Sequence, residues 1–76
     1  MPRTVPRTLV RLPSLADRRI RRGWTQRELA DAARTSRVNV GRIETGGETT
    51  PGMARRLADA LGCSIDDLMA QPSGSA

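Results

Sequence analysis

The apolar positions of the chain form short groups with helical spacing, and most groups follow a residue that caps helices. Leu29, Ala30 and Ala33 have the i, i+1, i+4 spacing of one helix face. Thr25 and, three residues later, Glu28 match the capping box that begins a helix. These positions predict a helix that starts after Thr25 and ends near Ala33.

A second helix is expected almost immediately after the first. Ser36 is a suitable N-cap, and Val40 and Ile43 are spaced to face a core. The remaining positions of this helix, which spans 36–45, then face away from the core: Arg37, Val38, Gly41 and Arg42. The sequence therefore predicts two short helices joined by a tight turn, with arginines on the outer face of the second.

Three more helices complete the expected fold. One starts after Ser14 and ends at Gly23, and Asp17 suits both a capping box and the positive end of this helix. Its narrow apolar face is Leu15, Ala16 and Ile20. Another covers 53–62, and a short last helix follows Ser64. The fold class that we expect is all-α: a compact five-helix domain.

The two ends of the chain differ in composition from this helical region. Residues 1–13 contain three prolines and three arginines, which predicts an extended basic arm, although a short strand within Thr8–Leu12 is also consistent with the sequence. Residues 70–76 have a composition typical of disorder. The expected organisation is an arm, a folded domain over residues 14–69, and a disordered tail.

Charge adds information about the partner. Among the 76 residues are thirteen arginines, no lysine and eight acidic residues, so the net charge is +5. This excess favours nucleic acid or an anionic membrane surface. The membrane is the weaker hypothesis, because the arginine-rich helix lacks a wide apolar face and no apolar run could span a bilayer. We expect a cytoplasmic, nucleoid-associated protein.

Enzymatic chemistry is not expected. The chain has no histidine and one cysteine, Cys63, which is too few ligands for a metal site. Cys63 lies in an apolar stretch and is interpreted as a small buried hydrophobe. The neighbouring Asp66 and Asp67 are explained by the positive end of a helix. We expect no enzyme activity, no cofactor and no metal.

Three separate sequence features carry a resemblance to a known family. The segment TQRELADAARTSRVNVGRIETG begins with TQ and closes with RIE-x-G, and LA-x-ALG then precedes a capped last helix. Together they resemble the lambda repressor/Cro-like family of helix-turn-helix regulators, also called the XRE family, over residues 14–69. The resemblance implies a DNA-binding domain whose second motif helix lies in the major groove.

The resemblance also implies roles for individual residues. The family's glutamine at the start of the first motif helix contacts a backbone phosphate, and here it is Gln26. The arginine and glutamate that pair across the core in some members match Arg19 and Glu44. The family reads bases from the first, second and sixth positions of the second motif helix, which are Arg37, Val38 and Arg42.

Side-chain chemistry supports the same base-reading positions independently. Arg37 and Arg42 are forked donors that suit O6 and N7 of guanine, whereas Val38 suits the methyl group of thymine. Asn39 suits adenine or, alternatively, a phosphate. We therefore expect a half-site with guanine on either side of a thymine-containing step.

Two departures from the family pattern affect the expected DNA contacts. The turn position usually held by glycine is Arg34, which must accept a left-handed conformation at a cost of about 1 kcal/mol, unless the turn differs. The loop GGETT includes Glu48 where relatives often place basic residues. The expected substitutes are the amides of Gly46 and Gly47 and the hydroxyl of Thr49.

Further contacts with the DNA backbone are expected from other parts of the chain. The hydroxyl-bearing residues at the ends of the motif helices are candidates for phosphate contacts: Thr25, Ser36 and Thr45. The arm supplies Arg3, Arg7 and Arg11, which we expect along the phosphates or in the minor groove, with plain disorder of the arm as an equal alternative.

The leading hypothesis is a homodimeric repressor or autoregulator that binds a palindromic operator in double-stranded DNA. The dimer element stays open between Leu9–Leu12 and the last helix, with Ile65, Leu68 and Met69. The alternative is an antitoxin or adaptor that acts mainly through a protein partner. Two outward arginines at groove-reading positions argue against that alternative.

Overall fold

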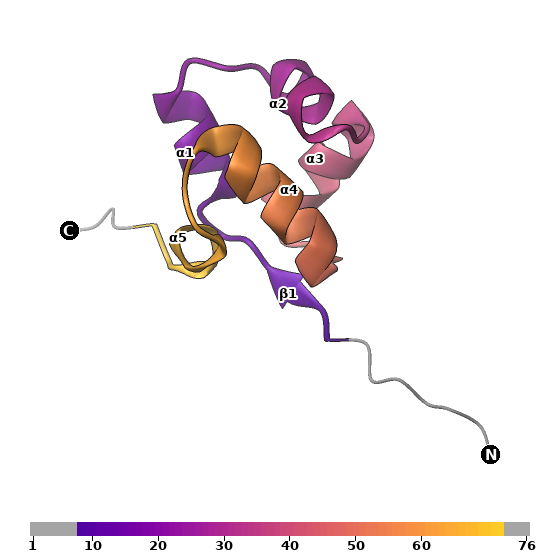
Figure 1. Ribbon diagram of the computed structural model, residues 1–76, viewed down its shortest axis with the longest axis vertical. Coiled ribbons are helices and arrows are strands. Elements are labelled where there is room, and N and C mark those ends of the chain that lie inside the picture. The colour runs from indigo at the N-terminus through magenta and orange to yellow at the C-terminus, as the bar shows by residue number, and fades with distance from the viewer. Residues whose placement is uncertain (1–7, 73–76) are drawn as a thin grey trace.

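A computed structural model describes residues 8–72 of the chain. Its elements follow in the order β1 (Val10–Arg11), α1 (Leu15–Arg21), α2 (Gln26–Ala33), α3 (Arg37–Glu44), β2 (Glu48–Thr49), α4 (Pro51–Leu61) and α5 (Ile65–Met69) (Figure 1). The expected all-α class with five helices is confirmed, and the two-stranded sheet is a minor addition. Within the described range, no helix is long and apolar enough to cross a membrane.

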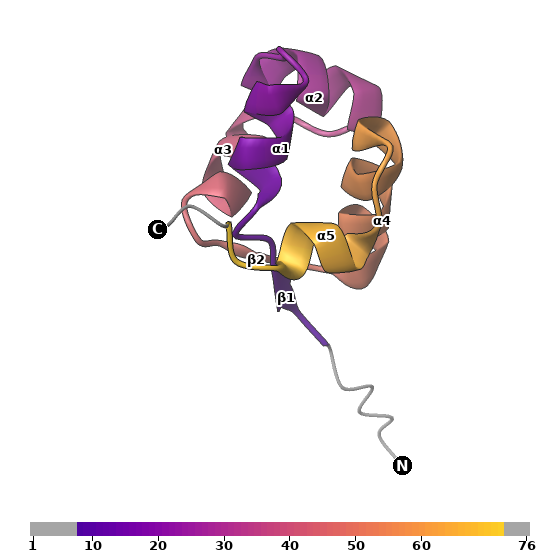
Figure 2. The same cartoon turned by 90° about the vertical axis from the view of Figure 1, so that its left-hand side faces the viewer.

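The helices surround a single aliphatic core. α2 packs against both α3 and α4, while α1 contacts α3 and α5, and α5 in turn contacts α4 (Figure 2). Every helix contributes to the buried cluster, which consists of Leu12, Leu15, Leu29, Ala30, Ala33, Val40, Ile43, Ala54, Leu57, Ala58, Leu61 and Leu68. The orientation of α3 is therefore set by the packing of the whole domain.

Side-chain caps explain where most helices begin. The Thr25 hydroxyl accepts from the Glu28 amide at 3.0 Å, and the Glu28 carboxylate accepts from the Thr25 amide at 2.8 Å. This is the capping box that the sequence predicts for α2. Ser64 and Asp67 form the same arrangement at α5, and Ser36 caps α3.

The start of α4 and the cap of α1 differ from the prediction. α4 begins at Pro51, two residues before the predicted Met53, because the Thr50 hydroxyl caps it and proline suits a first helical position. The predicted capping box of α1 is wrong. The Ser14 hydroxyl donates to the backbone carbonyl of Ala70 instead, and Asp17 pairs with a neighbouring arginine of its own helix.

The predicted apolar face of α1 is also wrong at one position. Leu15 is fully buried, but Ile20 is 63% exposed. Only the first turn of α1 contributes a buried residue, so the far end of this short helix projects beyond the core.

The segment before α1 belongs to the packed domain. β1 pairs antiparallel with β2, with Val10 opposite Thr49 and Arg11 opposite Glu48, and Leu12 is buried in the core. The strand expected within Thr8–Leu12 is thus present, and its partner is a strand of the same chain. The packed region begins before the predicted boundary at residue 14, while residues 1–7 and 73–76 lie outside the described part.

Candidate nucleic-acid interface

The turn between α2 and α3 brings the two motif helices close together. Ala30, at the centre of α2, is buried, and its carbonyl accepts from the Thr35 amide at 2.8 Å. Arg34 adopts φ 59° and ψ 49°, the left-handed conformation that reverses the chain after a helix. Of the two alternatives that the sequence left open at Arg34, the structure therefore has the left-handed turn.

A residue outside the motif holds this turn. Arg56, on α4, donates from Nη2 to the carbonyl oxygen of Arg34 at 2.7 Å. The bond satisfies a carbonyl that the end of α2 leaves without a helical partner. Sequence analysis missed this role of Arg56, because the two residues are 22 positions apart and no local pattern connects them.

The outer face of α3 is exposed over most of its length. Val40 and Ile43 are buried against the rest of the domain, whereas Arg37, Val38 and Arg42 are exposed. Val38 is a large apolar side chain that is 71% exposed. An exposed valine between two arginines has no packing role in the described structure, so this face is the candidate surface for a partner.

Arg42 and Asn39 are linked on this face. Arg42 donates from Nη2 to Asn39 Oδ1 and from Nη1 to the carbonyl oxygen of Glu48, each at 2.9 Å. The amide nitrogen of Asn39 donates to the Thr35 hydroxyl at 3.0 Å. Asn39 is therefore occupied at both ends of its amide within the protein, which the sequence alone did not indicate.

A buried polar network joins the motif to α1. Arg19 donates from Nε to Glu44 Oε2 at 2.6 Å and from Nη2 to Glu44 Oε1 at 3.1 Å. The side chains of Arg19 and Glu44 are 15% and 6% exposed. Arg19 also donates to the carbonyl of Trp24 at 2.7 Å, immediately before α2. These bonds tie α1, the start of α2 and the end of α3 together.

Gln26 lies at the edge of this network. Its Nε2 donates to Glu44 Oε1 at 2.9 Å, and its side chain is half-buried beside Gly41 of α3. A neutral amide has two N–H groups, so one donor of Gln26 remains for another acceptor. The structure thus gives Gln26 a contact within the protein without excluding the phosphate contact that the resemblance implies.

The loop after α3 differs from the expectation. The amides of Gly46 and Gly47 donate to the carbonyls of Ile43 and Arg42 at 3.1 and 2.9 Å, so they close the helix and are not free for a phosphate. Thr49 is only 6% exposed, because it pairs in the sheet. We therefore exclude these three groups from the candidate surface as a correction.

The remaining predicted phosphate contacts occupy exposed positions. Thr25 and Ser36 accept from backbone amides as N-caps, which leaves each hydroxyl proton available to a further acceptor. The Thr45 hydroxyl lies 3.1 and 3.0 Å from the carbonyls of Gly41 and Arg42. This bonding turns the Thr45 hydroxyl back toward its own helix.

The arm contributes one described arginine. Arg11 is exposed on β1, and its Nε lies 3.9 Å from the carboxylate of Glu48. A loose, exposed pair of this kind contributes little stability. Arg3 and Arg7 lie outside the described residues.

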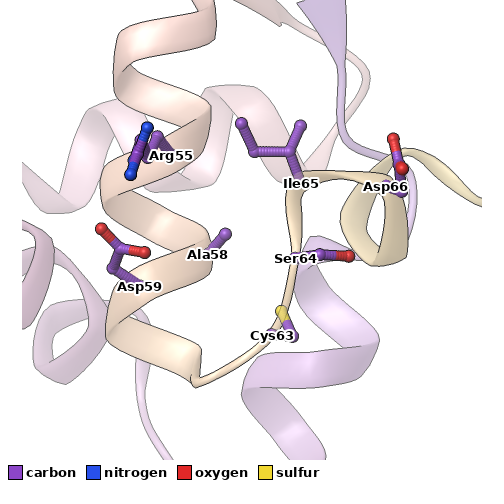
Figure 3. Close-up of a pocket in the computed structure, with 7 residues that line it drawn as sticks. All are labelled: Arg55, Ala58, Asp59, Cys63, Ser64, Ile65 and Asp66. Atoms are coloured by element: carbon purple, nitrogen blue, oxygen red, sulfur yellow. The ribbon is translucent and has the colours of Figure 1, made fainter.

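A shallow pocket lies on another part of the molecule, between α4 and α5 (Figure 3). Its lining residues are Arg55, Ala58, Asp59, Cys63, Ser64, Ile65 and Asp66. Partial burial raises the pKa of the Cys63 thiol, so this side chain is protonated at neutral pH and is a weak nucleophile. Among residues 8–72, no group of three or more potential metal ligands comes together.

Comparison with known proteins supports the interpretation of the α2–α3 unit. A family model described as "Helix-turn-helix" matches residues 15–68. A competence pilus inhibition repressor from Acinetobacter baylyi is 39% identical over 51 residues, which are 66% of this chain. The match covers 46% of that repressor, so the chain spans about half the length of this relative.

Two solved structures share the fold. The clp gene regulator ClgR from C. glutamicum has a TM-score of 0.68 at 34% identity, covering 72% of this chain and 73% of that protein. A hypothetical transcription factor, NHTF, from Neisseria has a TM-score of 0.72 at 26% identity, covering 91% of this chain and 88% of that protein. The chain therefore belongs to the XRE-type helix-turn-helix family of DNA-binding transcription regulators.

Proposed function

We propose that the protein is a sequence-specific regulator that inserts α3 into the major groove of its operator. The observation that carries this proposal is the outer face of α3, where Arg37, Val38 and Arg42 are exposed while the opposite face packs into the core. An α-helix fits the major groove, where each base pair presents a distinct pattern of donors, acceptors and methyl groups.

The chemistry of this face favours a particular half-site. Arg37 and Arg42 suit the O6 and N7 acceptors of guanine, and each such contact discriminates by about 1–3 kcal/mol against the wrong base. Val38 has no donor or acceptor, so its partner is the methyl group of thymine. The proposed half-site has guanine on either side of a thymine-containing step.

Contacts to the DNA backbone would set the register of α3. Gln26, Thr25 and Ser36 lie at the N-terminal ends of the two motif helices, where amide and hydroxyl donors and the helix dipole favour a phosphate. The arginines of residues 1–11 add sequence-independent affinity. These contacts orient the protein, and the outer face of α3 selects the sequence.

We further propose that the protein acts as a dimeric repressor. The relative from Acinetobacter baylyi bears that name, which supports repression as the direction of control. Two copies would place their α3 helices about 34 Å apart, one turn of DNA. Met69 of α5 is exposed and available for a dimer contact, whereas Ile65 packs partly against its own core and Leu68 is fully buried in it.

Selection of bound duplexes from a random DNA pool at about 150 mM salt tests this proposal. A two-fold symmetric motif with half-sites about 10 base pairs apart supports a dimeric reader. A single half-site retains the DNA reader and contradicts the dimer. If no sequence is enriched, sequence-specific recognition is wrong, and a protein partner becomes the leading alternative.

A further inference from the structure

The side chain of Arg42 is held in place before any DNA arrives. Its two terminal nitrogens donate to separate acceptors, Asn39 Oδ1 on the same helix and the Glu48 carbonyl on β2, both at 2.9 Å. A long exposed arginine ordinarily samples many rotamers, and ordering it on binding has an entropic cost. Arg42 has already been ordered by the fold.

Asn39 binds one side of the Arg42 guanidinium, and its own side chain is fixed by a further hydrogen bond. Its Nδ2 donates to the Thr35 hydroxyl at 3.0 Å, which fixes the amide so that Oδ1 faces Arg42. The backbone amide of Asn39 donates to Ser36 at the helix cap, so the residue lies in the rigid first turn of α3. The chain of bonds runs from the turn before α3, through Asn39, to Arg42.

Gly47 lies next to the other side of the Arg42 guanidinium. A Cβ atom at this position would lie 2.7 Å from Arg42 Nη1 and 2.7 Å from the Arg42 carbonyl oxygen. The second contact is with backbone, so a side chain at residue 47 would displace either Arg42 or the end of α3. The absence of a side chain at Gly47 thus provides the space that the guanidinium occupies.

We propose that Asn39 is a positioning residue, which orients Arg42 for base recognition, and that Asn39 does not itself read a base. The inference rests on the proposed function, in which Arg42 contacts guanine. An arginine has five N–H donors, so three remain after the two bonds within the protein, and a guanine contact needs two. The two bonds of the Asn39 amide fix its orientation, with Nδ2 toward Thr35 and Oδ1 toward Arg42, so turning the amide toward a base would break one of them.

The test compares base preferences of variants on the operator selected by the wild-type protein. Arg42→Lys identifies the base pair that Arg42 reads, because lysine cannot form the forked contact. Asn39→Ala is expected to reduce preference at that same base pair by about tenfold, within the range of a single base contact. Preference at the base pair opposite Arg37 should stay unchanged, and this position serves as the internal control.

A matched variant separates positioning from folding. Asn39→Asp keeps an oxygen that accepts from Arg42, so base preference should return, although the added negative charge lowers overall affinity. The melting temperature of each variant excludes a loss of fold as the cause. In the free protein, NMR of the Arg42 guanidinium should show slow exchange in the wild type and averaged signals in Asn39→Ala.

Several results would overturn the proposal. Relaxed preference of Asn39→Ala at a different base pair from Arg42→Lys would mean that Asn39 reads a base directly. An unchanged preference in Asn39→Ala would mean that Arg42 needs no positioning. In both cases the wild-type motif persists, so the proposed function survives. Failure to enrich any motif with the wild-type protein would overturn the function and the inference together.

Discussion

Arg19 contributes to the fold through hydrogen bonds to the end of α3 and to the segment just before α2. Its guanidinium, on α1, forms a two-point contact with Glu44 at the end of α3 and a third bond with the Trp24 carbonyl. Because both charged side chains are mostly buried, their stability depends on this mutual pairing. The pair therefore fixes where α3 ends relative to α1.

Replacing Glu44 with alanine tests this dependence. Glu44→Ala leaves the buried charge of Arg19 without its partner, and we expect a loss of about 3–5 kcal/mol in the free energy of unfolding. Urea denaturation followed by circular dichroism measures it. Arg21→Ala is the control, because it removes an exposed pair with Asp17 and should cost at most about 1 kcal/mol. Equal effects of the two substitutions would contradict the argument.

Asp67 makes a smaller, pH-dependent contribution. Hydrogen bonds from Ser64, first from its backbone amide, lower the pKa of the Asp67 carboxyl from its usual value of 3.8. A lowered pKa in the folded state stabilises the protein above the unfolded value, and this stabilisation is lost as pH falls through the folded pKa.

The difference in melting temperature between the wild type and Asp67→Asn should therefore shrink between neutral pH and about pH 2. Thermal melts at several pH values measure this difference. Asp31→Asn, which changes an exposed carboxylate in α2, serves as the control. A constant difference for Asp67→Asn across the pH range would show that the cap bond is independent of ionisation.

At the scale of elements, the turn between α2 and α3 determines how the motif helices cross. Arg34 occupies a left-handed conformation that costs a non-glycine residue about 1 kcal/mol. Thr35 and Arg56 compensate through bonds to carbonyls at the end of α2 and in the turn. These bonds thus maintain the crossing angle of α2 and α3, although Arg34 has an unfavourable backbone conformation.

Arg34→Gly should relieve this strain and raise the free energy of unfolding by up to about 1 kcal/mol. The bond from Arg56 goes to the backbone carbonyl of residue 34, so it remains. Gly62→Ala is the matched opposite change, because Gly62 ends α4 at φ +71°. This substitution should lower the free energy of unfolding by about as much as Arg34→Gly raises it. Thermal melts of both variants measure the two changes. Destabilisation by Arg34→Gly would mean that the arginine side chain contributes more than its backbone costs.

At the scale of the whole molecule, the segment from β1 to Ser14 contacts both the strand that follows α3 and the C-terminal end of the described chain. β1 pairs with β2, which directly follows α3, and Leu12 fills the core beside α1. Ser14 then bonds to the backbone of Leu68 and Ala70, beyond α4. Segments more than 50 residues apart therefore close the domain together.

Stepwise removal of the N-terminus should show where the domain begins. A chain that starts at Thr8 should melt at the same temperature as the full chain, because β1 and Leu12 remain. A chain that starts at Ser14 loses a fully buried leucine, at about 2–5 kcal/mol, which is a large part of the stability of a small domain. Circular dichroism melts compare the melting temperatures of the three chains. If the chain that starts at Ser14 is as stable as the full chain, the N-terminal boundary of the domain lies at residue 14.

The shorter truncation also tests the arm as a DNA contact. Removing residues 1–7 takes away Arg3 and Arg7. If each neutralises one phosphate, the slope of log affinity against log salt should fall by about 2. Fluorescence anisotropy on the selected operator measures it, and Arg55→Ala on α4 is the control. An unchanged slope would remove the arm from the proposed interface.

The sequence alone was sufficient for the features that depend on neighbours along the chain. The Thr25–Glu28 cap and the limits of α2 and α3 follow from residues within a few positions of one another, whereas the left-handed turn at Arg34 was one of two alternatives that the sequence left open. The exposed positions of α3 follow from helical periodicity for the same reason. The pairing of Arg19 with Glu44 was implied only by the family resemblance.

Only the tertiary structure decided the features that depend on distant partners. The Ser14 hydroxyl bonds to Ala70 instead of capping α1, because the two segments meet only after the chain has folded. Thr49 is buried by its pairing with Val10, and Arg56 reaches the carbonyl of Arg34, 22 positions away. In each case several partners suit the side chain equally well in the sequence, and the packing of the domain places only one of them within reach.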